Sequence, residues 1–358
     1  MPGRRRRVLR LALNAGIGLA VLPSAAAAAG SLPGQTFTVA WGGDVTPGSD
    51  YGRPPSQGRA MLAGVADVLA GVDVAAVNLE GTLGLGGAPK CAAHASPVCF
   101  AFQAPAANAA ALGEAGIDIV NLANNHANDY GPTGQFLTSR SLRRNGIAFT
   151  GRPGQIAYVP LPRARVAFLG FAPYPWASAL RDLDAVRRLV RRASRDANVV
   201  VVFMHAGAEG ADKVHTPDHD EEAFGERRGN ARAFAHAAVR AGADLVLGSG
   251  PHVLRGMEVY RERLIAYSLG NLAGFHNFSL GGRSALSAVL RVRVGPLGAF
   301  AAGTLRSLRL VGPGLPVPDP AAAAGRLIST LSAQDFGRRG IRVAADGRLV
   351  AGALPPPR

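Results

Sequence analysis

Short apolar runs recur along the chain, and stretches with apolar residues at helical spacing separate them. Buried strands of a parallel sheet read as continuous apolar runs, so this alternation predicts an α/β fold. The expected strands cover 36–40, 72–79, 117–122, 147–151, 156–161, 165–171, 199–204 and 244–247, then a hairpin at 259–267 and antiparallel strands at 286–294 and 304–311. The expected helices cover 59–70, 108–115, 134–145, 183–193 and 231–241.

Side chains that can bind a metal ion follow five of the apolar runs. They are Asp44, Glu80, Asn125 with its neighbour His126, His205 and His252. In open α/β sheets, ligands bind at the carboxyl ends of the strands, so we expect these side chains to gather at one edge. Each cluster alone is also compatible with an ordinary turn, because Asn, Asp and Gly favour turns. Their recurrence on successive β–α units favours a shared site.

The expected site mixes carboxylates, an amide and imidazoles. This mixture suits Mn²⁺, Zn²⁺ or iron better than Mg²⁺ or Ca²⁺, which prefer oxygen ligands, so one or two divalent metal ions are predicted. Glu80 would bridge two ions about 3.5–4 Å apart that clamp a phosphoryl group. His126 would protonate the leaving oxygen, with Asp129 orienting or tuning its ring. A purely structural polar cluster is the alternative.

The first 29 residues have the make-up of a secretory signal peptide. Arginines at positions 4–7 precede an apolar segment at 8–22 and small residues at 24–29. The apolar segment is short and is interrupted by Asn14 and Gly16, which makes it a weak membrane span, although an uncleaved anchor stays open. We therefore expect an exported protein of the periplasm or cell envelope, with the Sec and twin-arginine routes both open.

The charge of the chain points to an anionic partner. The net charge is +15, and loss of the five arginines within the first ten residues would leave about +10. In an exported protein this favours a wall polymer, lipid headgroups or another acidic polymer. Nucleic acid is not expected, because the compartment is wrong and no basic motif is interleaved with aromatic residues. Coding bias toward Arg is the alternative explanation, and the basic helix at 183–193 is interpreted as a solvated face.

Cys91 and Cys99 are the only cysteines, and they lie in one loop-like stretch. In an exported protein this spacing predicts a local disulfide. The intervening His94 would also permit a zinc site, but two cysteine ligands from one loop are too few to support it.

The order of several motifs resembles the CapA (PgsA-type) family of bacterial capsule or poly-γ-glutamate synthesis proteins, within the calcineurin-like metallophosphatase superfamily. The motifs are Gly-Asp-Val, Asn-Leu-Glu, Leu-Ala-Asn-Asn-His-Ala-Asn-Asp-Tyr-Gly, His-Ala-Gly-Ala-Glu-Gly, Pro-His-Val and Tyr-Ser-Leu-Gly-Asn, spread over 37–282. The resemblance implies a four-layer α/β/β/α sandwich of metallophosphatase type. It also implies that Asp44, Glu80, Asn125, His205 and His252 bind metal and that His126 acts as the acid. The expected domain covers 35–312, and 313–358 form a Pro- and Ala-rich tail.

Four positions depart from the pattern of these relatives. Ser249 and Gly250 stand where relatives often have a His, Thr46 stands where the superfamily usually has a His, and Glu80 replaces the usual Asp. Two functions therefore compete. One is a metal-dependent hydrolase of a phosphoester or an amide-linked envelope polymer. The other is a non-catalytic factor that binds an acidic polymer during export. Membrane components of a capsule or poly-γ-glutamate synthase are the implied partners.

Overall fold

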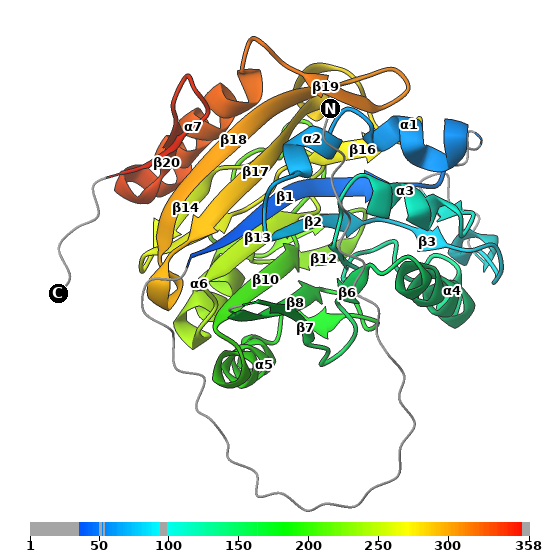
Figure 1. Cartoon of the computed structure of the whole chain (residues 1–358), viewed down its shortest axis with the longest axis horizontal. Coiled ribbons are helices and arrows are strands. Elements are labelled where there is room, and N and C mark those ends of the chain that lie inside the picture. Colours follow the sequence, from blue (N-terminus) through cyan, green and yellow to red (C-terminus); the bar gives the residue numbers. More distant parts are fainter. Residues whose placement is uncertain (1–35, 50–51, 53, 94–98, 163, 353–358) are drawn as a thin grey trace, which may run out of the picture.

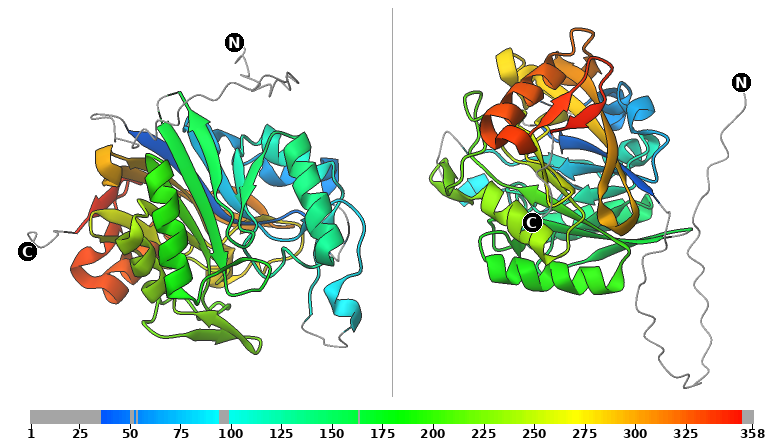
Figure 2. Two further views of the ribbon diagram at one scale, coloured as in Figure 1. Left: turned by 90° about the horizontal axis from the view of Figure 1, so that it is seen from below. Right: turned by 90° about the vertical axis from the view of Figure 1, so that its left-hand side faces the viewer.

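Two mixed β-sheets face each other, and helices cover both outer faces (Figure 1, Figure 2). The computed structural model describes residues 36–49, 52, 54–93, 99–162 and 164–352. The predicted four-layer α/β/β/α sandwich is thus confirmed. The expected signal peptide at 1–29 lies outside the described residues, and within them no helix is long and apolar enough to cross a membrane.

The first sheet has eight strands, with parallel pairs from β1 to β6 and antiparallel pairs from β1 to β19. The parallel strands are β1 (Phe37–Thr46), β2 (Val74–Leu79), β5 (Ile119–Asn121) and β6 (Ala148–Thr150), with β16 (Asn271–Gly274) also parallel to β1. The antiparallel strands are β17 (Leu286–Val294), β18 (Phe300–Val311) and β19 (Leu315–Pro318).

The second sheet has seven strands around a parallel centre. The parallel strands are β8 (Ala164–Ala172), β9 (Ser178–Ala179), β10 (Val199–His205), β13 (Leu245–Ser249) and β15 (Arg263–Ala266). The antiparallel edges are β7 (Ala157–Leu161) and β14 (Met257–Tyr260). Three two-stranded pairs lie outside both sheets: β3 (Thr82–Leu83) with β4 (Gln103–Ala104), β11 (Glu221–Ala223) with β12 (Glu226–Gly229), and β20 (Ile341–Val343) with β21 (Leu349–Ala351).

The helices divide between the two outer faces. Those that pack on the first sheet are α1 (Arg59–Leu62), α2 (Ala66–Leu69), α3 (Asn108–Glu114) and α4 (Gly131–Arg144), and those on the second are α5 (Leu183–Asp196) and α6 (Ala231–Ala241). The short 3₁₀ turns are η1 (Pro55–Gly58), η2 (Lys90–Ala93), η3 (Gly282–Ala285), η4 (Pro296–Gly298) and η5 (Gly337–Arg339). In Figure 1, α5 and α6 lie below the strands, and α1 and α3 lie on the opposite side.

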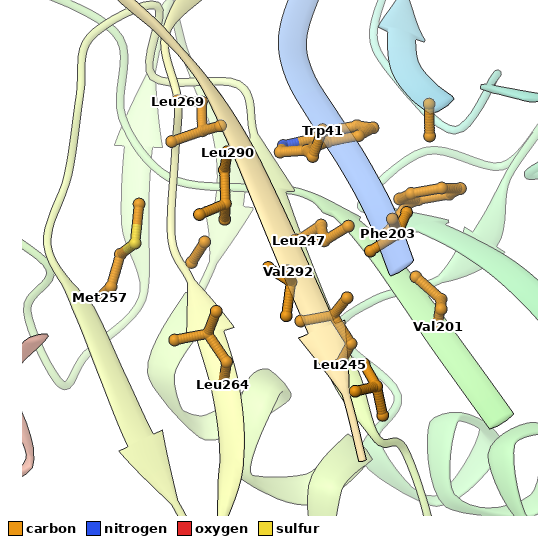
Figure 3. Packing of buried hydrophobic residues seen from close by; sticks show 14 of the residues in the cluster. Trp41, Val201, Phe203, Leu245, Leu247, Met257, Leu264, Leu269, Leu290 and Val292 are labelled. Carbon is orange, nitrogen blue, oxygen red and sulfur yellow. The ribbon is translucent and has the colours of Figure 1, made fainter. Parts of the chain in front are cut away.

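The alternation of side chains along each strand explains the layers. On β10, Val201 and Phe203 point into the core between the sheets, whereas Val202 and Met204 point toward α5 and α6. Trp41 of β1 stacks on Phe203 with ring centroids 4.9 Å apart, and its Nε1 donates to the Gly248 carbonyl at 3.2 Å (Figure 3). Strands that are apolar on both faces therefore hold all four layers together.

One predicted helix is broken. The pattern over 59–70 predicts a continuous helix, but the structure has the short α1 and α2 instead. The break includes Gly64, where a Cβ would lie 2.3 Å from the Pro316 carbonyl oxygen. This close approach requires glycine and brings in β19, a contact that helical spacing does not encode.

The stretch after residue 312 adds a strand to the first sheet and a helix to the core between the sheets. β19 pairs with β18, and α7 (Ala323–Phe336) contributes Ala324 and Ile328 to the core between the sheets. The domain boundaries at 35–312 and 313–358 stay a prediction.

Replacing Phe203 with Ala should lower the free energy of unfolding by about 3–5 kcal/mol, because the change empties the core between the sheets. Denaturant titration of the mature protein measures this. Phe136, which is 61% exposed on α4, is the control, and its Ala variant should differ from wild type by no more than about 0.5 kcal/mol. Equal effects of the two variants would contradict the layered core.

Asp244 gives the fold a pH dependence. Burial raises its pKa to about 6, although the Val200 N–H, at 2.9 Å, and Arg263, at 3.3 Å, oppose the rise. The folded state therefore holds this proton more tightly than the unfolded state, whose carboxyl titrates near 3.8. The stability that the proton confers is full below pH 3.8 and is lost as the pH rises through about 6.

An Asp244→Asn variant should lack this loss. Between pH 5 and 7.5, its free energy of unfolding should rise relative to wild type by about 1–1.5 kcal/mol, measured by urea titration at both pH values. A difference between the two proteins that does not change with pH would show that Asp244 titrates normally.

Candidate metal site

The carboxyl ends of parallel strands from both sheets meet at one edge. Asp44 lies near the end of β1, Glu80 directly follows β2, and His205 ends β10. All three side chains are buried, and one potential ligand atom from each lies within 4.8 Å of the other two. The structure thus brings these three predicted residues together, with two from the first sheet and one from the second.

His252 joins this cluster from the loop after β13. Its Nδ1 is 3.3 Å from Asp44 Oδ2, and its Nε2 is 3.7 Å from Glu80 Oε2. The residue has a φ of 57°, a strained conformation for a non-glycine residue and one often found at functional sites. Asn271 holds it there, because its Oδ1 accepts from His252 Nδ1 at 2.8 Å and its Nδ2 donates to the His252 carbonyl at 3.2 Å.

The backbone before Asp44 explains the glycine that precedes it. Gly43 has a φ of 78°, and a Cβ there would lie 2.4 Å from the Gly270 carbonyl oxygen. The same carbonyl accepts from the Asp44 N–H at 3.0 Å. The pairing of β1 with β2 shifts register between Trp41 and Asp44, and such bulges re-aim side chains beside functional sites.

Asn78 connects the carboxylates to the loop after β5. Its Nδ2 donates to Asp44 Oδ1 at 2.8 Å and to Glu80 Oε1 at 3.2 Å. Its Oδ1 accepts from Asn121 at 2.9 Å and from Asn124 at 3.1 Å. This buried amide network fixes one oxygen of each carboxylate, since Asn78 pairs on both sides of its amide group.

The loop after β5 presents Asn125 and His126. Asn125 Oδ1 is buried and has no hydrogen-bond partner among the described residues. His126 Nδ1 is 2.8 Å from Asp129 Oδ2, and the other carboxylate oxygen of Asp129 is 2.7 Å from Lys90 Nζ. The Phe102 ring packs against the imidazole with centroids 4.5 Å apart. Asp129 therefore orients His126, and Lys90 orients Asp129.

A disulfide-closed loop carries these supporting residues. Cys91 and Cys99 are bonded to each other, and Lys90 and Phe102 flank the pair. The Phe102 N–H donates to Asp129 Oδ2 at 2.6 Å. The pairing of β3 with β4 closes the loop at its base. The loop-like stretch around the two cysteines thus packs against the predicted acid, His126.

The electrostatics of the cluster reflect two buried acids side by side. Burial, and then the charge of Asp44, raise the pKa of Glu80 well above its ordinary value. Burial disfavours charge on His252, but Glu80, Asp44 and Glu209 outweigh it and raise the His252 pKa well above its ordinary value. Burial, and then the charge of Arg228, lower the pKa of His205 well below its ordinary value. A neutral His205 is the form that ligates metals.

The donor set fits a divalent cation. Asp44 Oδ2, Asn125 Oδ1 and His205 Nε2 are buried and have no hydrogen-bond partner among the described residues. Buried polar atoms are rarely left unpaired, because the loss of water costs free energy. A cation would coordinate these unpaired atoms. It would also neutralise the charge of Asp44 and Glu80, which a protonated His252 compensates without it.

The positions that depart from relatives have a structural basis. Ser249 Oγ is 3.1 Å from His205 Nδ1, so it contacts the imidazole without being a typical metal ligand. Gly250 has a φ of 115°, and a Cβ there would lie 3.0 Å from the Ala206 nitrogen, so a His would be strained. Thr46 is buried, and its Oγ1 has no hydrogen-bond partner among the described residues. The site is built without the additional imidazoles.

Sequence reasoning missed three residues at this edge. Asn78 could have been predicted from the sequence, because it lies two residues before Glu80 and alternate residues of a strand point to the same side. Glu209 Oε2 lies 3.8 Å from His252 Nε2, and Arg228 Nη1 lies 2.6 Å from Glu209 Oε1. Nothing in the polar segment that contains Arg228 distinguishes this arginine from solvated ones.

Comparison with known proteins supports the predicted family. The model of the family described as "Bacterial capsule synthesis protein PGA_cap" matches residues 38–275. "Capsule biosynthesis protein CapA" of Bacillus anthracis is 33% identical over 45% of this chain and 41% of its own length. "PGA biosynthesis protein CapA" of Bacillus subtilis is 29% identical over 43% of this chain and 41% of its own length. This chain thus spans about two fifths of the length of these two relatives.

Two further proteins resemble the chain over a longer stretch. The "Probable polyglutamine synthesis accessory protein" of Mycobacterium tuberculosis is 27% identical over 73% of this chain and 70% of its own length. Among solved structures, a purple acid phosphatase from yellow lupin seeds matches 80% of this chain and 55% of its own, with a TM-score of 0.38 and 9% identity.

Addition of Mn²⁺ should raise the melting temperature of chelator-treated protein by several degrees, because an ion at 100 times its dissociation constant stabilises the native state by about 2.7 kcal/mol. Asp44→Asn and His205→Ala should abolish the rise, as scanning calorimetry would show. His215→Ala is the control, since His215 is exposed and pairs with Asp335 away from the cluster. A wild-type protein that does not respond to Mn²⁺, Zn²⁺ or Fe²⁺ would argue against a metal site.

Proposed function

Because the chain belongs to the PGA_cap family of bacterial capsule synthesis proteins, we propose that it is an exported protein of capsule or poly-γ-glutamate biosynthesis that processes an envelope substrate by hydrolysis. The observation that carries the proposal is the buried group of Asp44, Glu80 and His205 at the edge shared by both sheets. A structural polar cluster would pair its buried atoms with one another, whereas His205 Nε2 and Asn125 Oδ1 lack hydrogen-bond partners among the described residues.

The proposed cofactor is Mn²⁺, Zn²⁺ or iron, as one or two ions. Asp44, Glu80, Asn125, His205 and His252 would hold it, with Glu80 as the bridge if there are two ions. A divalent ion here would supply Lewis-acid polarisation of a phosphoryl or carbonyl oxygen. The mixture of carboxylate, amide and imidazole donors favours these transition metals over Mg²⁺ and Ca²⁺.

The protein's own residues would move the proton. His126 Nδ1 donates to Asp129, which fixes the ring and leaves Nε2 to protonate the leaving oxygen. The salt bridge from Lys90, at 2.7 Å, holds Asp129 in place. Phe102 covers one side of the imidazole and excludes water from it. Hydrolysis of a phosphodiester, or of an amide in an anionic polymer, needs an acid at this position.

The expected setting follows from the N-terminal pattern and the charge. The signal-like segment at 1–29 supports export of the mature protein to the periplasm or cell envelope, with an uncleaved anchor as an option. Its excess of arginine suits an anionic polymer or phosphoester substrate. Membrane components of a capsule or poly-γ-glutamate synthase are the proposed partners.

A second function is favoured by Ser249, which stands where relatives often carry a histidine and offers a hydroxyl, 3.1 Å from His205 Nδ1, instead of a metal-binding imidazole. If this loss removes turnover, the protein acts as a non-catalytic factor that binds an acidic polymer and guides its export. Its positive charge serves that role equally well.

His126→Ala should lower the turnover of glycerophosphocholine, a phosphodiester whose alkoxide leaving group needs a proton, by the Mn²⁺-loaded protein by about 10²–10⁴-fold, the contribution typical of a positioned acid. The metal content, measured by elemental analysis, should not change, whereas Asn125→Ala should reduce it. His215→Ala again serves as the control. Wild-type protein that binds polyglutamate but hydrolyses neither this diester nor the polymer would support the second function instead.

A further inference from the structure

The hairpin β11–β12 presents one of two adjacent arginines to the candidate metal site. Arg227 is exposed and pairs with Asp220 at 2.5 Å, while Arg228 is only 2% exposed. The difference arises because consecutive residues of a strand point to opposite sides. The Arg228 carbonyl accepts from the Gly207 N–H at 3.3 Å, two residues beyond His205. The backbone of the hairpin is thus joined to the loop that leaves the site.

A second buried ion pair fixes the hairpin. Glu221, in β11, accepts from Arg255 through both carboxylate oxygens, at 2.7 and 2.8 Å, and both residues are buried. Arg255 Nε also donates to the Lys213 carbonyl at 2.9 Å. Bidentate pairs of this kind are geometrically specific. The hairpin is therefore held rigidly, and the position of Arg228 is set before any ligand arrives.

The guanidinium of Arg228 has unused binding capacity. Nη1 lies 2.6 Å from Glu209 and Nη2 lies 3.1 Å from Glu226, while Nε has no hydrogen-bond partner among the described residues. Glu209 in turn lies 3.8 Å from His252, so one carboxylate separates the guanidinium from the cluster. The side chain of Glu226 is 48% exposed, and its Oε2 also accepts from the Tyr174 hydroxyl at 2.7 Å, so a ligand oxyanion that replaces it would take over both donors.

An aromatic wall borders the guanidinium. Tyr174 and Trp176 stack with ring centroids 5.1 Å apart, and Arg228 Cζ lies 6.0 Å from the Tyr174 ring centroid. Trp176 Nε1 donates to the Asn124 carbonyl at 2.9 Å, which joins this wall to the loop that carries His126. A ligand at the metal edge is thus bounded by the aromatic pair and by the hairpin.

We propose that Arg228 is a substrate-binding residue that takes an oxyanion, either phosphoryl or carboxylate, of the molecule held at the Asp44–Glu80–His205 edge, with Glu226 as the counter-ion it releases. The planar fork of a guanidinium matches the geometry of both groups, and a water-poor environment strengthens the interaction. This inference rests on the proposed function for the identity of the site, but not on metal-dependent turnover.

The test is calorimetric titration of the mature protein with inorganic phosphate and, separately, with tetraglutamate. Arg228→Gln should weaken binding of the preferred probe about 10- to 100-fold, as expected for a lost hydrogen bond between charged groups. Arg227→Gln is the matched control, because it removes the neighbouring arginine of the same hairpin, and its affinity should equal that of wild type. A larger loss for phosphate identifies a phosphoryl group, and a larger loss for tetraglutamate identifies a carboxylate.

Two further variants cover the case in which Arg228→Gln does not fold. Arg228→Lys keeps the charge but not the fork and should show a smaller loss, while Glu226→Gln should tighten binding several-fold by freeing the guanidinium. Unchanged affinity in folded Arg228 variants, equal loss in Arg227→Gln, or a wild type that binds neither probe overturns the proposal. Titrations repeated after chelation separate the two claims, since a metal-free protein that still depends on Arg228 retains this site even if metal hydrolysis fails.

Discussion

The close approach of two buried carboxylates, Asp44 and Glu80, is the constraint on which this structure depends. Two ionised acids removed from water repel each other and lose their hydration, which is unfavourable without a compensating cation. Two side chains compensate the acids. His252 has a pKa raised by the surrounding carboxylates, and the amide of Asn78 donates to both of them. The strained backbone of His252 and the glycine before Asp44 are the local costs of assembling this edge.

The two-sheet architecture makes that assembly rigid. Asp44, Glu80 and His205 lie at the ends of buried strands, and the Trp41–Phe203 stack fixes the two sheets relative to each other just below them. The residues that would act on a substrate come instead from loops. His126 and Asp129 follow β5, and the disulfide-closed loop supports them through Lys90 and Phe102. Sites in which rigid strand ends hold the ligands and loops carry the reactive side chains are common in proteins.

The charges at the site and the net charge of the whole chain both favour an anionic ligand. The chain carries a net charge of +15, yet its most buried arginine near the metal edge, Arg228, is compensated by only two carboxylates, one of them half-exposed. An anionic ligand fits both the general attraction and this specific position.

The sequence by itself determined the strands, most helices and the set of residues at the strand ends, because apolar runs and the polar residues that follow them are local patterns. It also determined that Asp44, Glu80 and His205 could share a metal. Only the tertiary structure decided that a ligand atom of each lies within 4.8 Å of the other two, that the helix at 59–70 breaks where Gly64 meets Pro316, and that Arg228 is buried while Arg227 is exposed. Those features depend on contacts between segments far apart in the chain, and no periodicity within either segment records them.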